Sequence, residues 1–276
     1  MLESGGKRLK GKKRGMSQRA ILWGVIRYEF KMQARRRSLW IVFAGLALIM
    51  LAAMPGELIN SRPYAGGMTL LQLVASVTFD INWLPVIGIG IFLADRFPRE
   101  RSHRVDELFE ATVGTLRTRL AGKYIGCLLG TLLPAFLANS FDMCLFAFFK
   151  HTLLVLPLSL VTYSTIVVPG ICFVAAFTLA CTSFMWVPLY QFLFIGYWFW
   201  GNMLGPGTGL PTLSTTILTP RGSFIGAGLF GISALNGGTQ STTPLLGIAS
   251  MLLLLLIPLL VMLLFYRYLR WEQFRK

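Results

Sequence analysis

Charged side chains are scarce in this sequence, and histidine is almost absent. Of the 276 residues, 13% are charged and two are histidines, and residues 152–220 contain no Asp, Glu, Lys, Arg or His. Hydrophobic residues make up 55% of the chain, and the mean hydropathy is +0.65. This composition excludes a disordered chain and disfavours an ordinary soluble domain. It predicts an integral membrane protein, in which the net charge of +15 sets orientation and indicates no nucleic-acid partner.

The residue types that catalysis or metal binding needs are also few. His103 and His151 are far apart in the sequence, and the cysteines lie in apolar runs without a Cys-x-x-Cys spacing: Cys127, Cys144, Cys172 and Cys181. This favours packing residues over a zinc site. The sequence has no Gly-x-x-x-x-Gly-Lys-[Ser/Thr] phosphate loop. We therefore expect no catalytic residue, no metal site and no ATP-binding site in this chain.

Long apolar runs predict an all-α, polytopic membrane protein with six transmembrane helices. About 20 helical residues cross a hydrocarbon core of about 30 Å, because a helix rises about 1.5 Å per residue. The uncharged stretch is too long for one crossing, so we divide it at the polar residues 181–183. The expected spans are residues 39–54, 70–94, 123–149, 153–179, 186–203 and 245–265.

The positions of the basic residues predict the orientation of these spans. With the N-terminus inside, 12 basic residues precede the first span, seven lie between the second and third, and four follow the sixth. The external segments hold three, so the enrichment of cytoplasmic loops in Lys and Arg supports six spans in the cell membrane with both termini cytoplasmic. The expected regions are a basic tail (1–19), an amphipathic interfacial helix (20–37), a transmembrane domain (38–266) and a C-terminal tail (267–276).

The helix expected before the first span is amphipathic. Leu22, Ile26 and Phe30 share one face at a spacing of four residues, and basic residues line another face: Arg27, Lys31 and Arg35. This pattern predicts a helix that lies on the cytoplasmic leaflet and contacts membrane lipid. A general anchor for anionic lipid has the same pattern, so the helix alone identifies no function.

The segment between the second and third spans, residues 95–123, mixes charges of both signs. Three acids are followed by three bases: Asp106, Glu107 and Glu110, then Arg117, Arg119 and Lys123. Orientation alone would need only the basic residues. Interleaved charges around Leu108 and Phe109 favour a short structured helix that docks on a protein partner. A solvated charged loop is the alternative.

Together these features resemble the permease subunits of ATP-binding cassette (ABC) transporters of the type-2 exporter family. The residues that carry the resemblance are Tyr28-Glu29-Phe30, Ala94-Asp95-Arg96, Asp106-Glu107-Leu108-Phe109-Glu110-Ala111-Thr112 and Gly122-Lys123-Tyr124. Val113 stands where the family usually has proline. The likeness covers most of the chain as topology, but only these motifs match at the level of residues.

The resemblance implies a subunit of an ATP-driven exporter that works by alternating access. It makes residues 20–37 the elbow helix, with Leu22, Ile26, Glu29 and Phe30 as its marker residues. It makes residues 95–123 a coupling loop on a separate ATP-binding subunit, which would bind the ATP and Mg. The contact residues on that subunit would be Arg99, Glu100, Arg101, Asp106, Glu107, Leu108, Phe109 and Glu110. A second copy of the chain or a homologous permease would complete the translocation path.

The segment between the fifth and sixth expected spans, residues 201–244, is called the outer segment here. Its only charge is Arg221, and its apolar part, residues 223–235, is too short to cross a bilayer. This length predicts a re-entrant or interfacial helix, as in the similar family, and a loosely packed loop is the alternative. Three glycines are expected to form an outer gate: Gly226, Gly228 and Gly231.

The sequence leaves open the role of two aspartates and two alternative functions. Asp80 and Asp142 lie near the outer ends of expected spans, where an acid is either at the interface or functional inside the membrane. An intramembrane enzyme acting on lipid or peptide is one alternative function, although its usual His, carboxylate and serine motifs are absent. A non-transporting membrane anchor is the other. The transported substrate and its pathway are not predicted.

Overall fold

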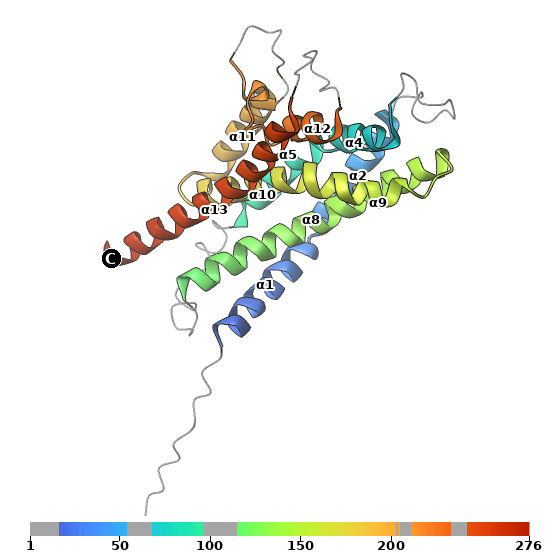
Figure 1. Ribbon diagram of the computed structural model, residues 1–276. Coiled ribbons are helices and arrows are strands. Elements are labelled where there is room, and N and C mark those ends of the chain that lie inside the picture. The colour runs from blue at the N-terminus through green and yellow to red at the C-terminus, as the bar shows by residue number, and fades with distance from the viewer. Residues whose placement is uncertain are drawn as a thin grey trace, which may run out of the picture.

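The computed structural model describes residues 17–53, 68–96, 115–202, 204, 211–232 and 242–275. Within these residues every regular element is a helix, which confirms the all-α prediction (Figure 1). Four helical stretches are long and apolar enough to cross a membrane: Leu70–Ala94, Leu116–Phe149, Val155–Cys181 and Pro244–Gln273. Their length and composition support a membrane protein.

Two further helices coincide with expected spans but are shorter. Helix α2 is Arg37–Ala53 with 17 residues, and helix α11 is Val187–Asn202 with 16 residues. At about 1.5 Å per residue each is about 25 Å long, which is less than a hydrocarbon core of about 30 Å. The described chain therefore supports four membrane-spanning helices, and the count of six stays a prediction.

Helix α1 (Gln18–Ala34) runs beside the first half of helix α8 (Leu116–Phe149) (Figure 1). Helix α8 has 34 residues and is about 51 Å long, so it exceeds a hydrocarbon core. It begins about two turns before the expected start at Lys123. The reason is local: the Thr115 hydroxyl accepts a hydrogen bond from the Thr118 backbone N–H at 3.3 Å and caps the helix there.

The second expected span consists of two helices, α4 (Leu70–Ile81) and α5 (Trp83–Ala94), with Asn82 between them. Pro85 has no N–H to donate to the carbonyl of Ile81, four residues earlier, which explains the break. Thr69 and Gln72 form a capping box at the start of α4 and so define its first residue.

The fourth expected span is helical throughout but changes its winding. It consists of α9 (Val155–Thr162), a π-helical turn η1 (Tyr163–Val167) and α10 (Val168–Cys181). Pro169 cannot donate to the carbonyl of Thr165, and the wider π turn lies directly before it. The proline therefore accounts for the position of the irregular turn.

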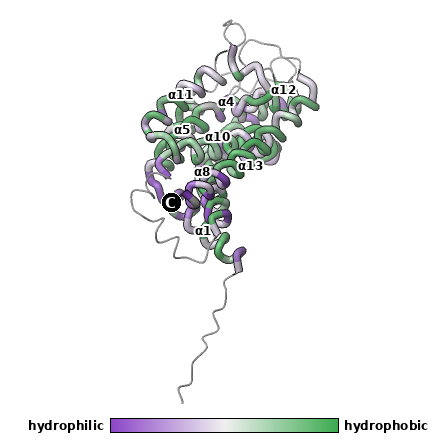
Figure 2. Tube along the Cα trace, turned by 90° about the vertical axis from the view of Figure 1, so that its left-hand side faces the viewer, coloured by the Kyte–Doolittle hydropathy of each residue, from purple (hydrophilic) through white to green (hydrophobic). Residues whose placement is uncertain are grey.

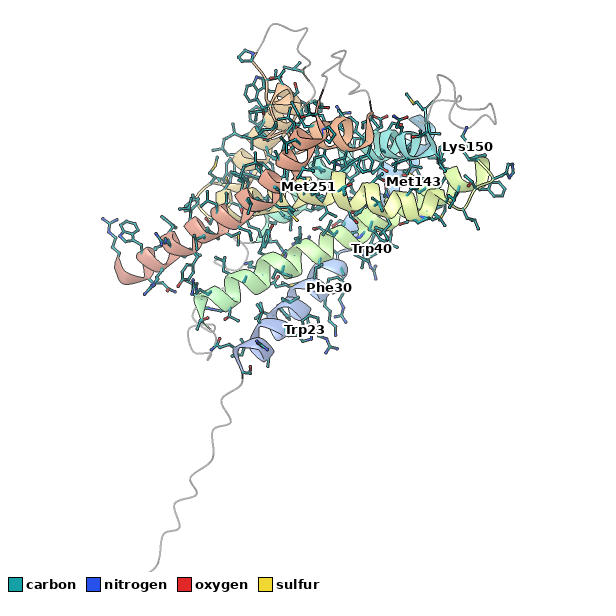
Figure 3. All side chains as sticks on the ribbon, in the orientation of Figure 1. Trp23, Phe30, Trp40, Met143, Lys150 and Met251 are labelled. Carbon is teal, nitrogen blue, oxygen red and sulfur yellow. The ribbon has the colours of Figure 1, made fainter. Side chains whose placement is uncertain are left out.

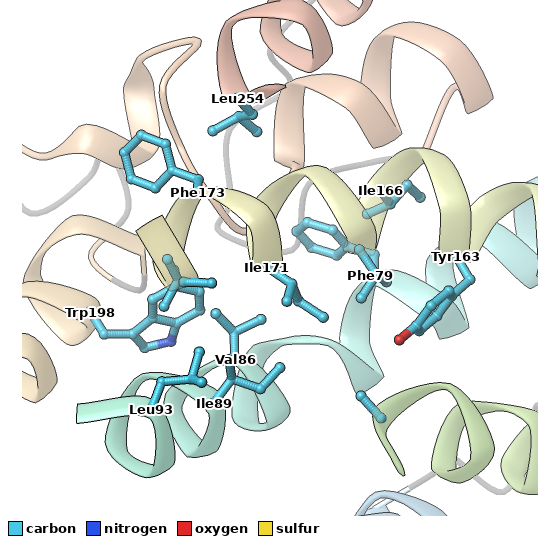
Figure 4. Packing of buried hydrophobic residues seen from close by; sticks show 14 of the residues in the cluster. Phe79, Val86, Ile89, Leu93, Tyr163, Ile166, Ile171, Phe173, Trp198 and Leu254 are labelled. Carbon is cyan, nitrogen blue, oxygen red and sulfur yellow. The ribbon is translucent and has the colours of Figure 1, made fainter. Parts of the chain in front are cut away.

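The main hydrophobic core lies where α5, α10 and α11 meet, as Figure 4 shows for Val86, Ile89, Ile171 and Trp198. Helix α13 (Pro244–Arg275) packs along α10 and along the short helix α12 (Ser223–Phe230). Most of its leucines remain exposed, as expected of a helix that faces lipid. In Figure 2, hydrophilic residues gather along α1, at the start of α8 and at the C-terminal end of α13, and apolar residues predominate in the middle of the bundle. This polar end holds the described basic residues that we expect in the cytoplasm.

The described part of the outer segment is folded against the bundle. It contains a short 3-10 turn, η3 (Leu213–Thr215), and helix α12 (Ser223–Phe230). Helix α12 packs on α13, α4 and η1, and Ile225 is completely buried. It ends before the apolar run does, because Gly231 has a φ of +66° that terminates the helix.

Candidate functional site

Three glycines on one face of α8 let α1 approach closely. Gly122, Gly126 and Gly130 are spaced by four residues, so they form one stripe. A methyl group at Gly126 would lie 2.5 Å from the Cβ atom of Glu29 and 2.8 Å from the carbonyl oxygen of Ile26. One at Gly130 would lie 2.7 Å from the Cβ atom of Gln33. Glycine is therefore required for this close contact of two parallel helices.

A buried ion pair lies at this contact. The Nη2 atom of Arg96, directly after α5, donates to the Oε2 atom of Glu29 on α1 at 3.1 Å. The thiol of Cys127 on α8 lies 3.6 Å from the same oxygen, and Lys123, one turn earlier, is only 6% exposed. Glu29 and Arg96 are each 5% exposed. A single carboxylate thus joins α1, the end of α5 and α8.

A second contact holds the start of α8 against the start of α1. The hydroxyl of Thr118 donates to the side-chain Oε1 of Gln18 at 3.2 Å. The described chain stops at Arg96 and resumes at Thr115. The described residues on either side of 97–114 are therefore bound to the same helix, α1: Arg96 through its ion pair with Glu29, and Thr118 through its hydrogen bond to Gln18.

The expected marker residues of the first helix lie on α1, but its buried face is not purely apolar. Ile26 and Glu29 are buried and Leu22 and Phe30 are half-buried, whereas Trp23 is 67% exposed (Figure 3). The predicted basic face is exposed: Arg27, Lys31 and Arg35. The buried face contacts α8, and includes Glu29 and Gln33 because the glycine stripe accepts them.

The sequence pattern does not predict that Arg96 is the partner of Glu29. Arg96 and Lys123 belong to motifs that carry the family resemblance, which pairs neither of them with Glu29. A sequence signal for the close contact of α1 with α8 does exist. It is the four-residue spacing of the glycines and the matching spacing of Glu29 and Gln33. The eight residues assigned to ATPase contact lie outside the described residues: Arg99, Glu100, Arg101, Asp106, Glu107, Leu108, Phe109 and Glu110.

At the other end of the bundle, two of the expected gate glycines are in close contacts. A methyl group at Gly228 would lie 3.0 Å from the Cα atom of Gly247 on α13 and 2.9 Å from the carbonyl oxygen of Thr243. One at Gly226 would meet the flexible end of Ile232 at 2.5 Å. The third, Gly231, supplies the positive φ that ends α12. Gly228 is therefore the position at which α12 and α13 touch through their backbones.

The single charge of the outer segment is buried against α4. The Arg221 guanidinium lies 4.4 Å from the centre of the Phe79 ring, and its Nη2 atom is 3.9 Å from the Oδ1 atom of Asp80. Burial lowers the pKa of Arg221 from its usual value, and the nearby Asp80 carboxylate opposes that change. This cation attaches the segment before α12 to the second expected span.

No protein-family model, curated protein or solved structure matches this chain. In the described part of the chain, no group of three or more His, Cys, Asp or Glu side chains could hold a metal ion. The candidate site is therefore defined by geometry alone. It comprises the Glu29–Arg96 ion pair at one end of the bundle and the contact of α12 with α13 at the other.

We expect Gly228→Leu to disrupt the packing of α12 on α13, at a cost of about 1–3 kcal/mol in stability, because the backbones leave no room for a side chain. Gly196→Leu on α11 is the matched control, since a methyl group there meets nothing within 4 Å. Thermal unfolding of the two variants in detergent measures the difference. Equal midpoints would show that α12 packs loosely.

Proposed function

We propose that this chain is the membrane subunit of an ATP-driven exporter. In this proposal it forms the translocation path by alternating access with a second copy or a homologous permease. A separate ATPase subunit docks on residues 97–114 and binds the ATP and Mg. Helix α1 acts as the elbow helix, and α2 and α11 complete a set of six spans with both termini in the cytoplasm.

The observation that carries the proposal is that α1 binds a described residue on each side of residues 97–114. Arg96 binds Glu29 at 3.1 Å, and Thr118 binds Gln18 at 3.2 Å. The mixed charges of residues 97–114 suit a protein partner. A partner that moves this segment would therefore move α1, α5 and α8 together, because packed helices shift as units and deform little.

This arrangement accounts for the burial of charge at the site. A simple lipid anchor needs only an apolar face and exposed basic residues. A buried ion pair costs desolvation energy and stabilises a fold less than apolar packing of the same volume does. It does, however, fix which helices meet, so it suits a joint that transmits movement between α1, α5 and α8. This favours the coupled permease over the anchor.

We expect the double variant Glu107→Arg with Glu110→Arg to lose the ATPase partner while the membrane subunit still inserts. Reversing charges at a buried interface typically costs about 2–5 kcal/mol, which is roughly 30-fold or more in affinity. The full chain is tagged, expressed in its source cell and purified in mild detergent. The vanadate-sensitive ATPase activity that co-elutes with the tagged chain is then measured.

Glu57→Arg is the control for this experiment, because it reverses one charge in a segment that we expect on the opposite face of the membrane. It should keep the co-purifying hydrolysis. A wild-type preparation without ATP hydrolysis would contradict the exporter proposal. Equal hydrolysis in the wild type and the double variant would instead contradict docking at residues 97–114.

A further inference from the structure

Helices α1, α4 and α8 carry the acidic side chains Glu29, Asp80 and Asp142, and Asp142 differs from the other two. Glu29 pairs with Arg96, and Asp80 pairs with Arg221. Asp142 on α8 is completely buried, yet neither of its carboxylate oxygens has a hydrogen-bond partner in the described part of the chain. It lies about two turns before the end of α8, next to Met143, which Figure 3 labels. Its burial shows that it faces protein.

Helix register places Asp142 in a polar layer of the bundle. Phe136 of α8 contacts Tyr163 with ring centres 5.4 Å apart, and Met143 belongs to the same packed cluster as Val155. Residues 136–143 of α8 therefore lie beside residues 155–163 of the antiparallel chain segment that includes α9. The buried polar side chains at this depth are Asn139, Ser159, Thr162 and Thr78.

The hydroxyl groups of this layer already use their protons. Ser159 donates to the carbonyl of Leu156 at 2.8 Å, and Thr162 donates to the carbonyl of Ser159 at 3.1 Å. Thr78 lies 2.9 Å from both the carbonyl of Val74 and the hydroxyl of Thr162. Each hydroxyl has one proton but two lone pairs. The layer can therefore accept further hydrogen bonds more readily than it can donate them.

The helices packed on this half of α8 supply no compensating cation at this depth. Helices α5, α9 and α10 and the η1 turn contain no charged residue, and the only charge of α2 is Arg37 at its first position. The one charge of α4, Asp80, is an acid and pairs with Arg221. On α1 and α13 the charges lie toward the polar end, and Lys150 and His151 follow the last turn of α8. The neutral amide nitrogen of Asn139, three residues before Asp142, is also buried, but it makes no hydrogen bond to Asp142.

We propose that Asp142 is a proton-binding site inside the membrane, which carries its proton in the arrangement described here. An ionised carboxylate in an apolar interior is costly unless a cation or several donors stabilise it. A neutral carboxylic acid avoids that cost, because it carries no charge and only its O–H group needs an acceptor. A proton also needs no cavity, which suits a completely buried group.

This site links a proton to the conformation of the bundle. The O–H bond forms with a proton taken from water, and release of that proton to water leaves the carboxylate. Helices α2 and α9 pack on α8, and Asp142 of α8 is completely buried. Separation of these helices would admit water and stabilise the carboxylate, so opening and proton release would favour each other. The proposal does not depend on the exporter function.

Infrared spectroscopy of the full chain in liposomes at neutral pH tests the site directly. We expect a carbonyl-stretch band of a neutral carboxylic acid in the wild type and loss of that band in Asp142→Asn. Asp80→Asn is the matched control, since Asp80 faces a cation, and it should keep the band. The amide is isosteric with the neutral acid, so Asp142→Asn should fold.

A second measurement avoids substitution altogether. Carbon-13 labelling of the aspartate side-chain carboxyl groups should shift the same band in the wild-type protein, because a heavier carbon lowers the carbonyl-stretch frequency. The shift assigns the band to one of the four aspartates. A band that shifts with labelling and is absent from Asp142→Asn supports the proposal. A wild-type spectrum without a labelled carboxylic-acid band, or a band that persists in Asp142→Asn, would overturn it.

Discussion

Replacing Arg96 with methionine should lower the free energy of unfolding by about 3–5 kcal/mol, the cost of removing one partner from a buried ion pair. Glu29 and Arg96 are each only 5% exposed, and their atoms are 3.1 Å apart. The variant removes the guanidinium and leaves the Glu29 carboxylate in the same buried contact of three helices. Reversible unfolding of the purified protein in mixed micelles of mild detergent and dodecyl sulfate measures the loss.

The double variant Glu29→Gln with Arg96→Met separates charge from shape. It removes both charges while keeping side chains of similar size, so we expect it to recover most of the stability that Arg96→Met loses. Arg35→Met is the control, because Arg35 is exposed on α1 and its replacement should change stability by no more than about 0.5 kcal/mol. Equal stability of Arg96→Met and Arg35→Met would show that the ion pair has no role in joining the helices.

Gly126→Ala should destabilise the protein by about 1–3 kcal/mol, although alanine is the better helix former. The added methyl group would lie 2.5 Å from the Cβ atom of Glu29 and 2.8 Å from the Ile26 carbonyl oxygen. Neither atom can move without moving the α1 backbone. We therefore expect α1 to separate from α8, which spin labels on the two helices can measure as a longer distance.

Gly24→Ala provides a control with the opposite expected sign. Gly24 is also a helical glycine of α1, but a methyl group there meets nothing within 4 Å. It should therefore stabilise the protein by about 0.5–1 kcal/mol through its lower backbone entropy in the unfolded state. Both substitutions gain the same helix propensity, so the difference between them isolates the packing of α1 on α8. A stabilising Gly126→Ala would contradict the close contact.

The Glu29–Arg96 ion pair and the glycine stripe of α8 lie in one joint, which is the contact of α1 with α8 and with the end of α5. The glycine stripe determines how near α1 comes to α8, and the ion pair determines which side chains meet there. If Arg96→Met and Gly126→Ala weaken the joint and also reduce the ATPase activity that co-elutes with the chain, docking of the partner depends on the joint. If they weaken the joint and leave the hydrolysis unchanged, docking depends on residues 97–114 alone.

Sequence by itself determined the helical class and the approximate position of the main helices. Apolar runs and helix caps are local properties, so the stretches at 70–94, 116–149, 155–181 and 244–273 were predictable to within a few residues. Two ends differ more. The last stretch continues to Gln273, eight residues past the expected end at 265. Helix α8 begins at Leu116, seven residues before the expected start at 123, because Thr115 caps it there.

Tertiary structure alone decided which residues meet. Glu29 and Arg96 are 67 positions apart, and no periodicity in either segment pairs them. The apolar pattern of α1 indicated a lipid-facing helix, yet the glycines of α8 form a groove that buries Glu29 and Gln33. Asp142 lay near the outer end of an expected span by sequence, and only the rotation of α8 within the bundle places it completely inside protein. Helix formation depends on neighbours along the chain, whereas these contacts depend on how close two backbones can approach and on which face each helix turns inward.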